Sequence, residues 1–138
     1  NPPGKFETEM KYLLNPTEFY VKIYSPPDLF AGKIHAVLFR KWGERLKGRD
    51  WYDFIWFVKN NIPVHLEHLQ ERMKQTDHLE AKAGLGLDSL QALLKERIEA
   101  FDIDLAKKDI EPFISDSTRL NIWSKDFFLD AASKIRVI

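Results

Sequence analysis

Residues 31–40 read AGKIHAVLFR and residues 45–54 read RLKGRDWYDF. Between positions 33 and 49 there are six basic residues and one acid, in a chain whose net charge is +0. Asp50 and Asp53 follow directly, within an aromatic segment. Charges in an apolar segment cost free energy to bury unless they are paired or used. We therefore expect the functional site to lie in this part of the chain.

Composition narrows the class of protein. The 138 residues, 44% of them hydrophobic, suit one compact domain or part of one. The balanced charge excludes a global attraction to nucleic acid, and the absence of cysteine excludes disulfides and thiolate metal sites. No apolar run approaches the ~18 residues of a membrane span, and no signal peptide is visible. We expect a cytoplasmic protein without a membrane partner.

The hydrophobic pattern predicts an α+β fold that is mostly α. Two strands, over 5–14 and 17–25, are expected to form a short N-terminal β-hairpin, because apolar and polar residues alternate in the second one. A bundle of about five to six helices should follow. The expected helices span about 27–40, 49–60, 64–76, 87–101, 104–114 and 123–136. The predicted units are therefore a hairpin at 1–25, the remnant of a larger sheet, and a helical domain at 26–138.

The first helix presents two cations on one face. Lys33, Ala36, Val37 and Arg40 are spaced i, i+3, i+4 and i+7, so their side chains share that face. Lys33 and Arg40 are about 10 Å apart along the axis, with a small residue between them, which leaves room for a polyanion. Two solvated residues on an amphipathic helix would produce the same spacing.

The second helix carries two acids near its start. Asp50 is explained by the helix dipole, which favours acids in the first turn. Asp53 lies one turn deeper in an apolar segment and therefore needs a cationic or hydrogen-bonding partner, for which Lys33, Lys47 and Arg49 are the candidates. A structural salt bridge and a catalytic carboxylate predict the same residues here.

These residues carry a resemblance to a known family. Ala31-Gly32-Lys33-x-x-Ala36-x-x-x-Arg40, followed by Arg45-x-Lys47-x-Arg49-Asp50-x-x-Asp53, resembles the third and fourth motifs of the AbiEii/AbiGii-type nucleotidyltransferases. Those proteins are toxins of type IV toxin–antitoxin and abortive-infection systems, within the DNA polymerase β-like superfamily. The Trp-rich helix, the break at 61–63 and the helical tail are similar to the family as well, so the resemblance covers most of the chain.

The resemblance implies roles for individual residues. Lys33 and Asp53 would be catalytic, and the nucleotide or its phosphates would be held by a set of five residues. That set is Lys33, Arg40, Lys47, Arg49 and Asp50. The implied reaction transfers a nucleotide from an NTP, with Mg²⁺, to an acceptor hydroxyl such as the 3′ end of tRNA, and a cognate antitoxin is the implied protein partner. Such transfer depends mainly on positioning and charge neutralisation.

One feature departs from the superfamily pattern, which begins with a Gly-Ser loop and paired aspartates that bind two Mg²⁺ ions. The chain has no Gly-Ser dipeptide, and its only Asp-x-Asp is Asp102-Ile103-Asp104. We interpret Asp102 as a helix N-cap. We therefore expect the chain to be the C-terminal portion of such an enzyme, inactive alone and with no cofactor bound by itself.

The remaining polar and aromatic candidates receive structural interpretations. His65 and His68 are spaced i, i+3, but no third ligand converges in the sequence, so we expect surface histidines and no metal site. Trp42 is the best candidate for stacking on a base, whereas Trp56 and Phe57 are expected in the core.

Two other functions stay open. A non-enzymatic helical module could bind RNA or a protein through residues 40–49, and such binding would weaken with salt but survive loss of Asp53. A purely structural domain would lose only stability when Lys33 or Asp53 is changed.

Overall fold

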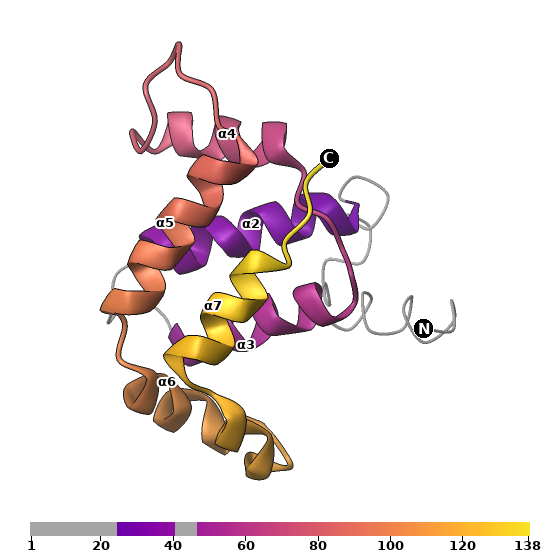
Figure 1. Ribbon diagram of the computed structural model, residues 1–138, viewed down its shortest axis with the longest axis vertical. Coiled ribbons are helices and arrows are strands. Elements are labelled where there is room, and N and C mark those ends of the chain that lie inside the picture. Colours follow the sequence, from indigo (N-terminus) through magenta and orange to yellow (C-terminus); the bar gives the residue numbers. More distant parts are fainter. Residues whose placement is uncertain (1–24, 41–46) are drawn as a thin grey trace.

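The computed structural model describes residues 25–40 and 47–138 of the chain (Figure 1). The described part is mostly helical, as predicted. Its elements are α2 (Pro26–Phe39), α3 (Lys47–Lys59), α4 (Leu66–Gln75), α5 (Leu87–Ala100), α6 (Ile103–Ile110), the 3₁₀ helices η2 (Glu111–Phe113) and η3 (Ser117–Ile122), and α7 (Lys125–Ser133). The hairpin predicted at 1–25 lies, apart from Ser25, outside the described residues.

Helix α2 begins where the sequence predicts. Ser25 is its N-cap with an extended backbone, Pro26 and Pro27 occupy the first turn, and Asp28 places an acid at the positive end of the helix dipole. The hydroxyl of Ser25 donates to Asp28 Oδ2 at 2.9 Å. Proline suits the first turn because the backbone N–H that it lacks would have no partner within the helix there.

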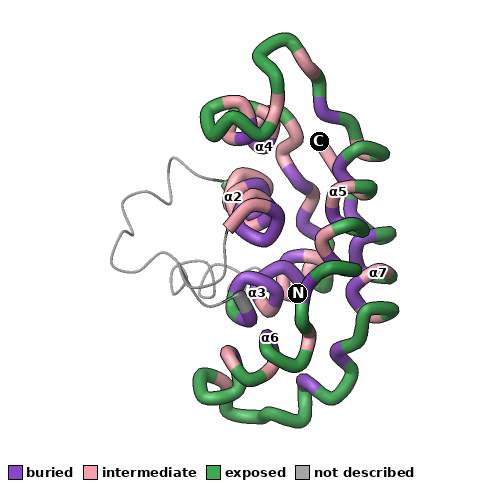
Figure 2. Tube along the Cα trace, turned by 90° about the vertical axis from the view of Figure 1, so that its left-hand side faces the viewer, coloured by how far each residue is buried: buried purple, intermediate pink, exposed green. Residues whose placement is uncertain are grey.

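Helix α2 lies between α3 and α4, and it packs against both (Figure 1). Helices α5 and α7 pack against each other. Helix α3 also packs against α6. Buried positions face inward, whereas exposed positions follow the outer sides of α5, α6 and α7 (Figure 2). Helices α3, α4 and α5 pack against α2. This packing fixes the two faces of α2 that carry its polar side chains.

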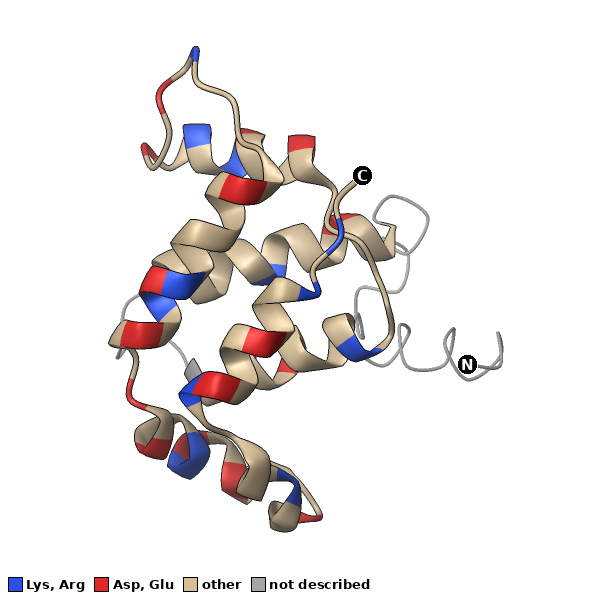
Figure 3. Cartoon of the chain, in the orientation of Figure 1, with Lys and Arg blue, Asp and Glu red and all other residues tan. Residues whose placement is uncertain are grey.

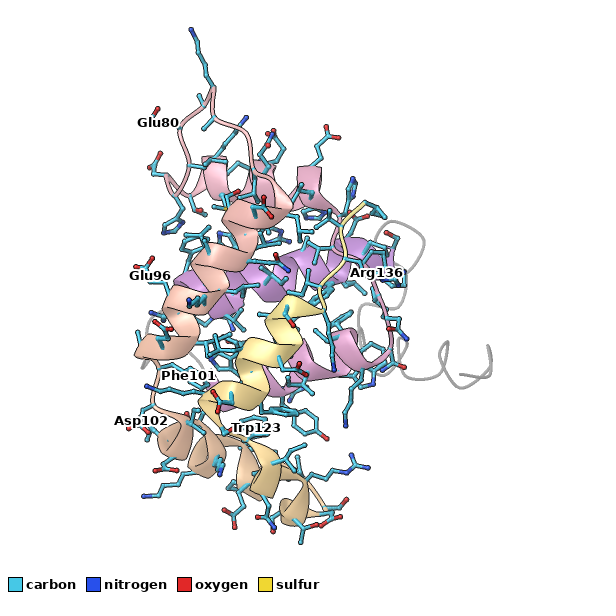
Figure 4. All side chains as sticks on the ribbon, in the orientation of Figure 1. Glu80, Glu96, Phe101, Asp102, Trp123 and Arg136 are labelled. Carbon is cyan, nitrogen blue, oxygen red and sulfur yellow. The ribbon has the colours of Figure 1, made fainter. Side chains whose placement is uncertain are left out.

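Two aromatic groups form much of the core. Phe30 of α2 stacks on Phe57 of α3 with ring centroids 4.9 Å apart, which fixes α2 against α3. Trp51 stacks on Phe101 at 4.5 Å, and the ring of Phe128 meets Trp51 edge-on at 5.2 Å. Figure 4 shows Phe101 and Trp123 at the lower ends of α5 and α7. Phe57 is thus in the core as predicted.

The end of the chain lies beside the segment that leads into α4. Val64 and Val137 form an isolated parallel bridge, in which Val64 N donates to Arg136 O at 2.8 Å and Ile138 N donates to Val64 O at 2.9 Å. The backbone N–H of His65 donates to Pro27 O at 3.2 Å. These contacts hold the start of α2, the start of α4 and the C-terminal segment together.

Charges of both signs are scattered over the described helices rather than gathered by sign (Figure 3). This distribution agrees with the net charge of +0. None of the described helices combines the length and the apolar character that crossing a membrane requires.

Candidate functional site

Helices α2 and α3 run antiparallel, and two ion pairs join them. Lys33 Nζ lies 2.7 Å from Asp53 Oδ2. Two turns further along α2, Arg40 Nη1 donates to both carboxylate oxygens of Asp50, at 2.8 and 2.7 Å. Lys33, the earlier cation of α2, thus meets Asp53, the later acid of α3. Arg40, the later cation, meets Asp50, the earlier acid. Four of the predicted site residues are brought together in this way.

The carboxylates of the two pairs are buried and the cations are less so. The Asp50 side chain is 2% exposed and that of Asp53 is 10% exposed, whereas Arg40 is 20% and Lys33 is 28% exposed. Asp50 therefore does more than complement the helix dipole, which was the interpretation from its position alone. It is a buried charge that depends on Arg40 for compensation.

One oxygen of Asp53 is incompletely satisfied. Oδ2 is buried and, within the described residues, receives no hydrogen bond of suitable direction, although the ammonium of Lys33 is only 2.7 Å away. At that distance Lys33 neutralises the carboxylate by its charge, and the distance decides that the two residues are paired. A buried acceptor without a directed donor is uncommon in native proteins and points to strain or function.

Arg97 of α5 is a positioning residue that the sequence did not reveal. Its guanidinium donates to Val37 O at 3.2 Å and to Arg40 O at 3.1 Å. No basic residue of α2 itself lies in the last turn, so Arg97 supplies the cation for the carbonyl groups at that end. Because it holds the backbone of Arg40, it also fixes the origin of the Arg40 side chain. No local sequence signal joins residues 57 positions apart.

Gly48 allows the start of α3 to approach α6. A Cβ atom at this position would lie 2.1 Å from the carbonyl oxygen of Ala106, which is closer than any real contact. The glycine between Lys47 and Arg49 is therefore required by packing rather than by a positive φ. It holds the first turn of α3, and with it Asp50, in place.

The other predicted phosphate-binding residues are only partly placed. Arg49 is exposed at the start of α3. The side chain of Lys47 and all of Trp42 lie outside the described residues. Trp56 is partly buried, packed against the core.

The described residues do not fit the two-Mg²⁺ centre that the resemblance implies. Asp50 and Asp53 are held by cations, and Asp102 caps α6 by accepting from Leu105 N at 3.0 Å, as predicted. Within the described part of the chain, no carboxylates of the α2–α3 pairs belong to a cluster of metal-ligating residues. No catalytic step through Mg²⁺ is assigned to these residues.

Comparison with known proteins decides the family. A family model described as the nucleotidyl transferase AbiEii toxin of type IV toxin–antitoxin systems matches residues 2–131. The chain belongs to the AbiEii family. Membership agrees with the resemblance of the two α2–α3 motifs and makes nucleotidyl transfer the activity of its family. No curated protein and no solved structure matches this AbiEii chain.

A second polar cluster joins α2 to α4 and contains the two histidines that the sequence analysis paired by spacing. His65 Nδ1 and His68 Nδ1 both contact Asp28 Oδ1, the second at 2.9 Å. The expectation that no third ligand converges on the two histidines is therefore wrong, because the fold brings Asp28 to them from 37 residues away. Both histidines are partly buried rather than freely exposed surface residues.

The carboxyl of Asp28 is ionised by its surroundings. Burial raises its pKa, but the hydrogen bonds from His65, His68 and Ser25 and the charge of His65 outweigh that effect. The pKa of Asp28 is held far below its ordinary value. The junction of α2 and α4 thus contains a fixed negative charge beside two imidazoles.

Proposed function

We propose that this chain is the C-terminal, nucleotide-binding part of a toxin that transfers a nucleotide from an NTP to an acceptor hydroxyl, such as the 3′ end of tRNA. In this proposal residues 26–138 form the helical domain, residues 1–25 are the remnant of a nucleotidyltransferase sheet, and the isolated chain is inactive. The cognate antitoxin is its proposed protein partner. The single observation that supports the proposal most is the antiparallel pairing of Lys33 with Asp53 and of Arg40 with Asp50.

The exposure of the four groups suits an anion. The carboxylates lie behind and the cations lie nearer to solvent, so an approaching triphosphate meets Lys33 and Arg40 first. The two cations are about 10 Å apart along α2, a span that a triphosphate can bridge. Lysine acts as a point charge on phosphate, whereas arginine offers two parallel donors.

The carboxylates hold the cations in place before the nucleotide arrives. A side chain that is already held in its binding orientation loses less conformational entropy when the ligand binds. The two pairs together carry no net charge, however, so they attract phosphate weakly by themselves. We assign the additional positive charge to Lys47 and Arg49, at the start of α3. Of these, Arg49 is exposed.

Asp53 is the proposed catalytic-region carboxylate. Asp53 lies behind Lys33, so when Lys33 turns toward a phosphate the buried carboxylate keeps the ammonium within reach. In the reaction the acceptor oxygen forms a bond to the α-phosphorus, the bond from that phosphorus to the pyrophosphate leaving group breaks, and the hydroxyl proton passes to water. Catalysis of this kind is mostly positioning and charge stabilisation.

The test uses the parent protein with its upstream segment, Mg²⁺, each labelled NTP in turn and total tRNA. We expect label on RNA with the unchanged protein, and a loss of about 100-fold or more with Lys33→Ala and with Asp53→Asn. Lys59→Ala is the matched control, since Lys59 is an exposed cation in the last turn of α3. Circular dichroism and thermal melting verify that each variant folds.

Two outcomes would overturn the proposal. Label that persists in folded Lys33→Ala and Asp53→Asn would show that the ion pairs are structural only. Absence of label on RNA or protein, with salt-sensitive RNA binding that survives loss of Asp53, would identify a binding module instead.

A further inference from the structure

We propose that Asp28, His65 and His68 form a binding site for one divalent transition-metal ion of the zinc class. The ligand atoms of the three residues lie within 4.8 Å of one another. Within the described part of the chain this is the only such cluster. The proposal is independent of nucleotidyl transfer, because none of the three residues belongs to the α2–α3 pairs.

The fold prepares the three ligands before any ion arrives. Asp28 lies in the first turn of α2, His65 is the N-cap of α4, and His68 lies one turn further along α4 on the same face. The backbone of His65 is anchored by its bond to Pro27 O, and Leu66 N donates to Ile138 O, both at 3.2 Å. The ligands therefore come from two helices whose relative position is fixed by main-chain bonds.

The donor set suits zinc and its neighbours. Two imidazole nitrogens and one carboxylate oxygen are common zinc ligands, and a three-residue set leaves further positions for water or another ligand. The same set also binds Fe²⁺, Co²⁺ and Ni²⁺, whereas Mg²⁺ and Ca²⁺ prefer oxygen alone. The side chain of His65 is 40% exposed, so an ion can reach the site from solvent.

The hydrogen bond from Arg72 to His68 disfavours metal binding. Its Nε donates to His68 Nε2 at 2.9 Å, so the hydrogen-bond network assigns the imidazole proton of His68 to Nδ1, which faces Asp28. A metal on Nδ1 requires that proton on Nε2. The proton on Nδ1 of His65, which meets the same carboxylate oxygen, must leave that nitrogen as well. The proton on Nε2 of His68 then points at a donor. Arg72 must turn away, which lowers the affinity of the site.

This conflict gives a prediction that a purely structural hydrogen-bond cluster does not make. In Arg72→Gln the shorter side chain offers an amide oxygen that can accept from His68 Nε2–H, as outer partners of metal-bound histidines usually do. The variant also removes a positive charge beside the ion. We therefore expect Arg72→Gln to bind the metal about 10-fold more tightly than the unchanged chain.

The experiment measures metal binding by the full chain after treatment with a chelator. Titration calorimetry with Zn²⁺ and the visible absorption of Co²⁺ report stoichiometry and coordination. We expect one ion per chain, a loss of affinity of about 100-fold in His68→Ala and Asp28→Asn, and no change in His78→Ala. His78 is the matched control because it is an exposed histidine outside the cluster.

The Arg72→Gln measurement keeps the test decisive if the ligand variants unfold. Tighter binding by that variant, with a Co²⁺ spectrum of nitrogen and oxygen ligation, supports the site. Equal affinity for Zn²⁺ in the unchanged chain, Asp28→Asn and His68→Ala would overturn it. So would the absence of one-to-one binding in both the unchanged chain and Arg72→Gln, since the cluster would then be a hydrogen-bonded clamp only.

Discussion

Helix α2 carries polar chemistry on two sides, and the two sides differ in sign. Toward α3 it presents cations, Lys33 and Arg40, backed by buried carboxylates. Toward α4 it presents a carboxylate, Asp28, met by two imidazoles. The first arrangement offers positive groups to an anion, whereas the second gathers two imidazole nitrogens and one carboxylate oxygen, which are ligands for a metal cation. The two proposals thus assign ligands of opposite charge to one helix, because separate neighbours complete each side.

The largest expected effect comes from the Arg40–Asp50 ion pair at the end of α2, on the side that faces α3. Arg40→Met keeps the length of the side chain but leaves Asp50, with a side chain only 2% exposed, as a buried charge without its cation. We expect the free energy of unfolding to fall by about 3–5 kcal/mol. Urea unfolding followed by circular dichroism measures it.

The double variant Arg40→Met/Asp50→Leu is the control for this prediction. Replacing both partners by apolar groups removes the uncompensated charge, so most of the lost stability should return. A single variant as stable as the unchanged chain would show that Asp50 finds another partner or reaches water.

Packing of α3 on α6 gives the next largest effect. Gly48→Ala places a methyl group 2.1 Å from the carbonyl oxygen of Ala106, and backbone must move to relieve the contact. We expect a loss of about 1–3 kcal/mol, measured by urea unfolding, in spite of the better helix propensity of alanine.

Gly32→Ala is the matched control on the neighbouring helix. Its added Cβ would meet only the Arg72 side chain, at an ordinary 3.7 Å. We expect it to be neutral or to stabilise by up to about 1 kcal/mol. Equal behaviour of the two alanine variants would contradict the close approach of α3 to α6.

Arg97→Gln should lower the stability of the α3 side of α2 by a smaller amount. The variant loses hydrogen bonds from a charged donor to Val37 O and Arg40 O. We expect thermal melting to show a loss of about 1–2 kcal/mol. Nucleotide transfer by the parent protein should also fall, because the Arg40 backbone is held less firmly. Lys95→Gln, an exposed cation on the same helix, should change neither quantity.

The smallest effect concerns His35, on the α4 side of α2. Burial lowers its pKa, and the charges of Arg72, His78 and Arg40 lower it further. The unfolded chain therefore binds a proton at a higher pH than the folded chain does. His35 should cause no loss of stability above its ordinary pKa near 6.5 and a growing loss as the pH falls below that value.

Melting curves at several pH values compare the unchanged chain with His35→Gln. The variant should lose less stability than the unchanged chain between neutral and mildly acidic pH, since glutamine does not titrate. Parallel curves for the two proteins would contradict the assignment. The comparison isolates His35 from the other histidines, which are present in both proteins.

Local sequence patterns predicted the helices well, because the residues that begin and cap a helix lie within a few positions of its ends. The start of α2 follows from Ser25 and two prolines, and Asp102 caps α6 through a contact three residues long. Residues 77–86, which lie between two of the predicted helices, contain no helix. The helical pattern likewise placed α5 at Leu87–Ala100, within one residue of the prediction.

Partners across helices were beyond local patterns. Three cations were candidates for Asp53, and only packing of α2 on α3 selects Lys33. Arg97 reaches the end of α2 from α5, and Asp28 reaches His65 over 37 residues. Each of these contacts depends on which faces of two helices meet. Spacing within one helix contains no information on that choice.

The most direct test of the central claim is nucleotide transfer by the parent protein with its Lys33–Asp53 charges exchanged, in Lys33→Asp/Asp53→Lys. If the pair acts on the nucleotide, the exchange should recover much of the stability lost in Lys33→Asp alone, while transfer stays about 100-fold or more below that of the unchanged protein. Recovery of transfer together with stability would contradict the claim and leave the pair a structural salt bridge.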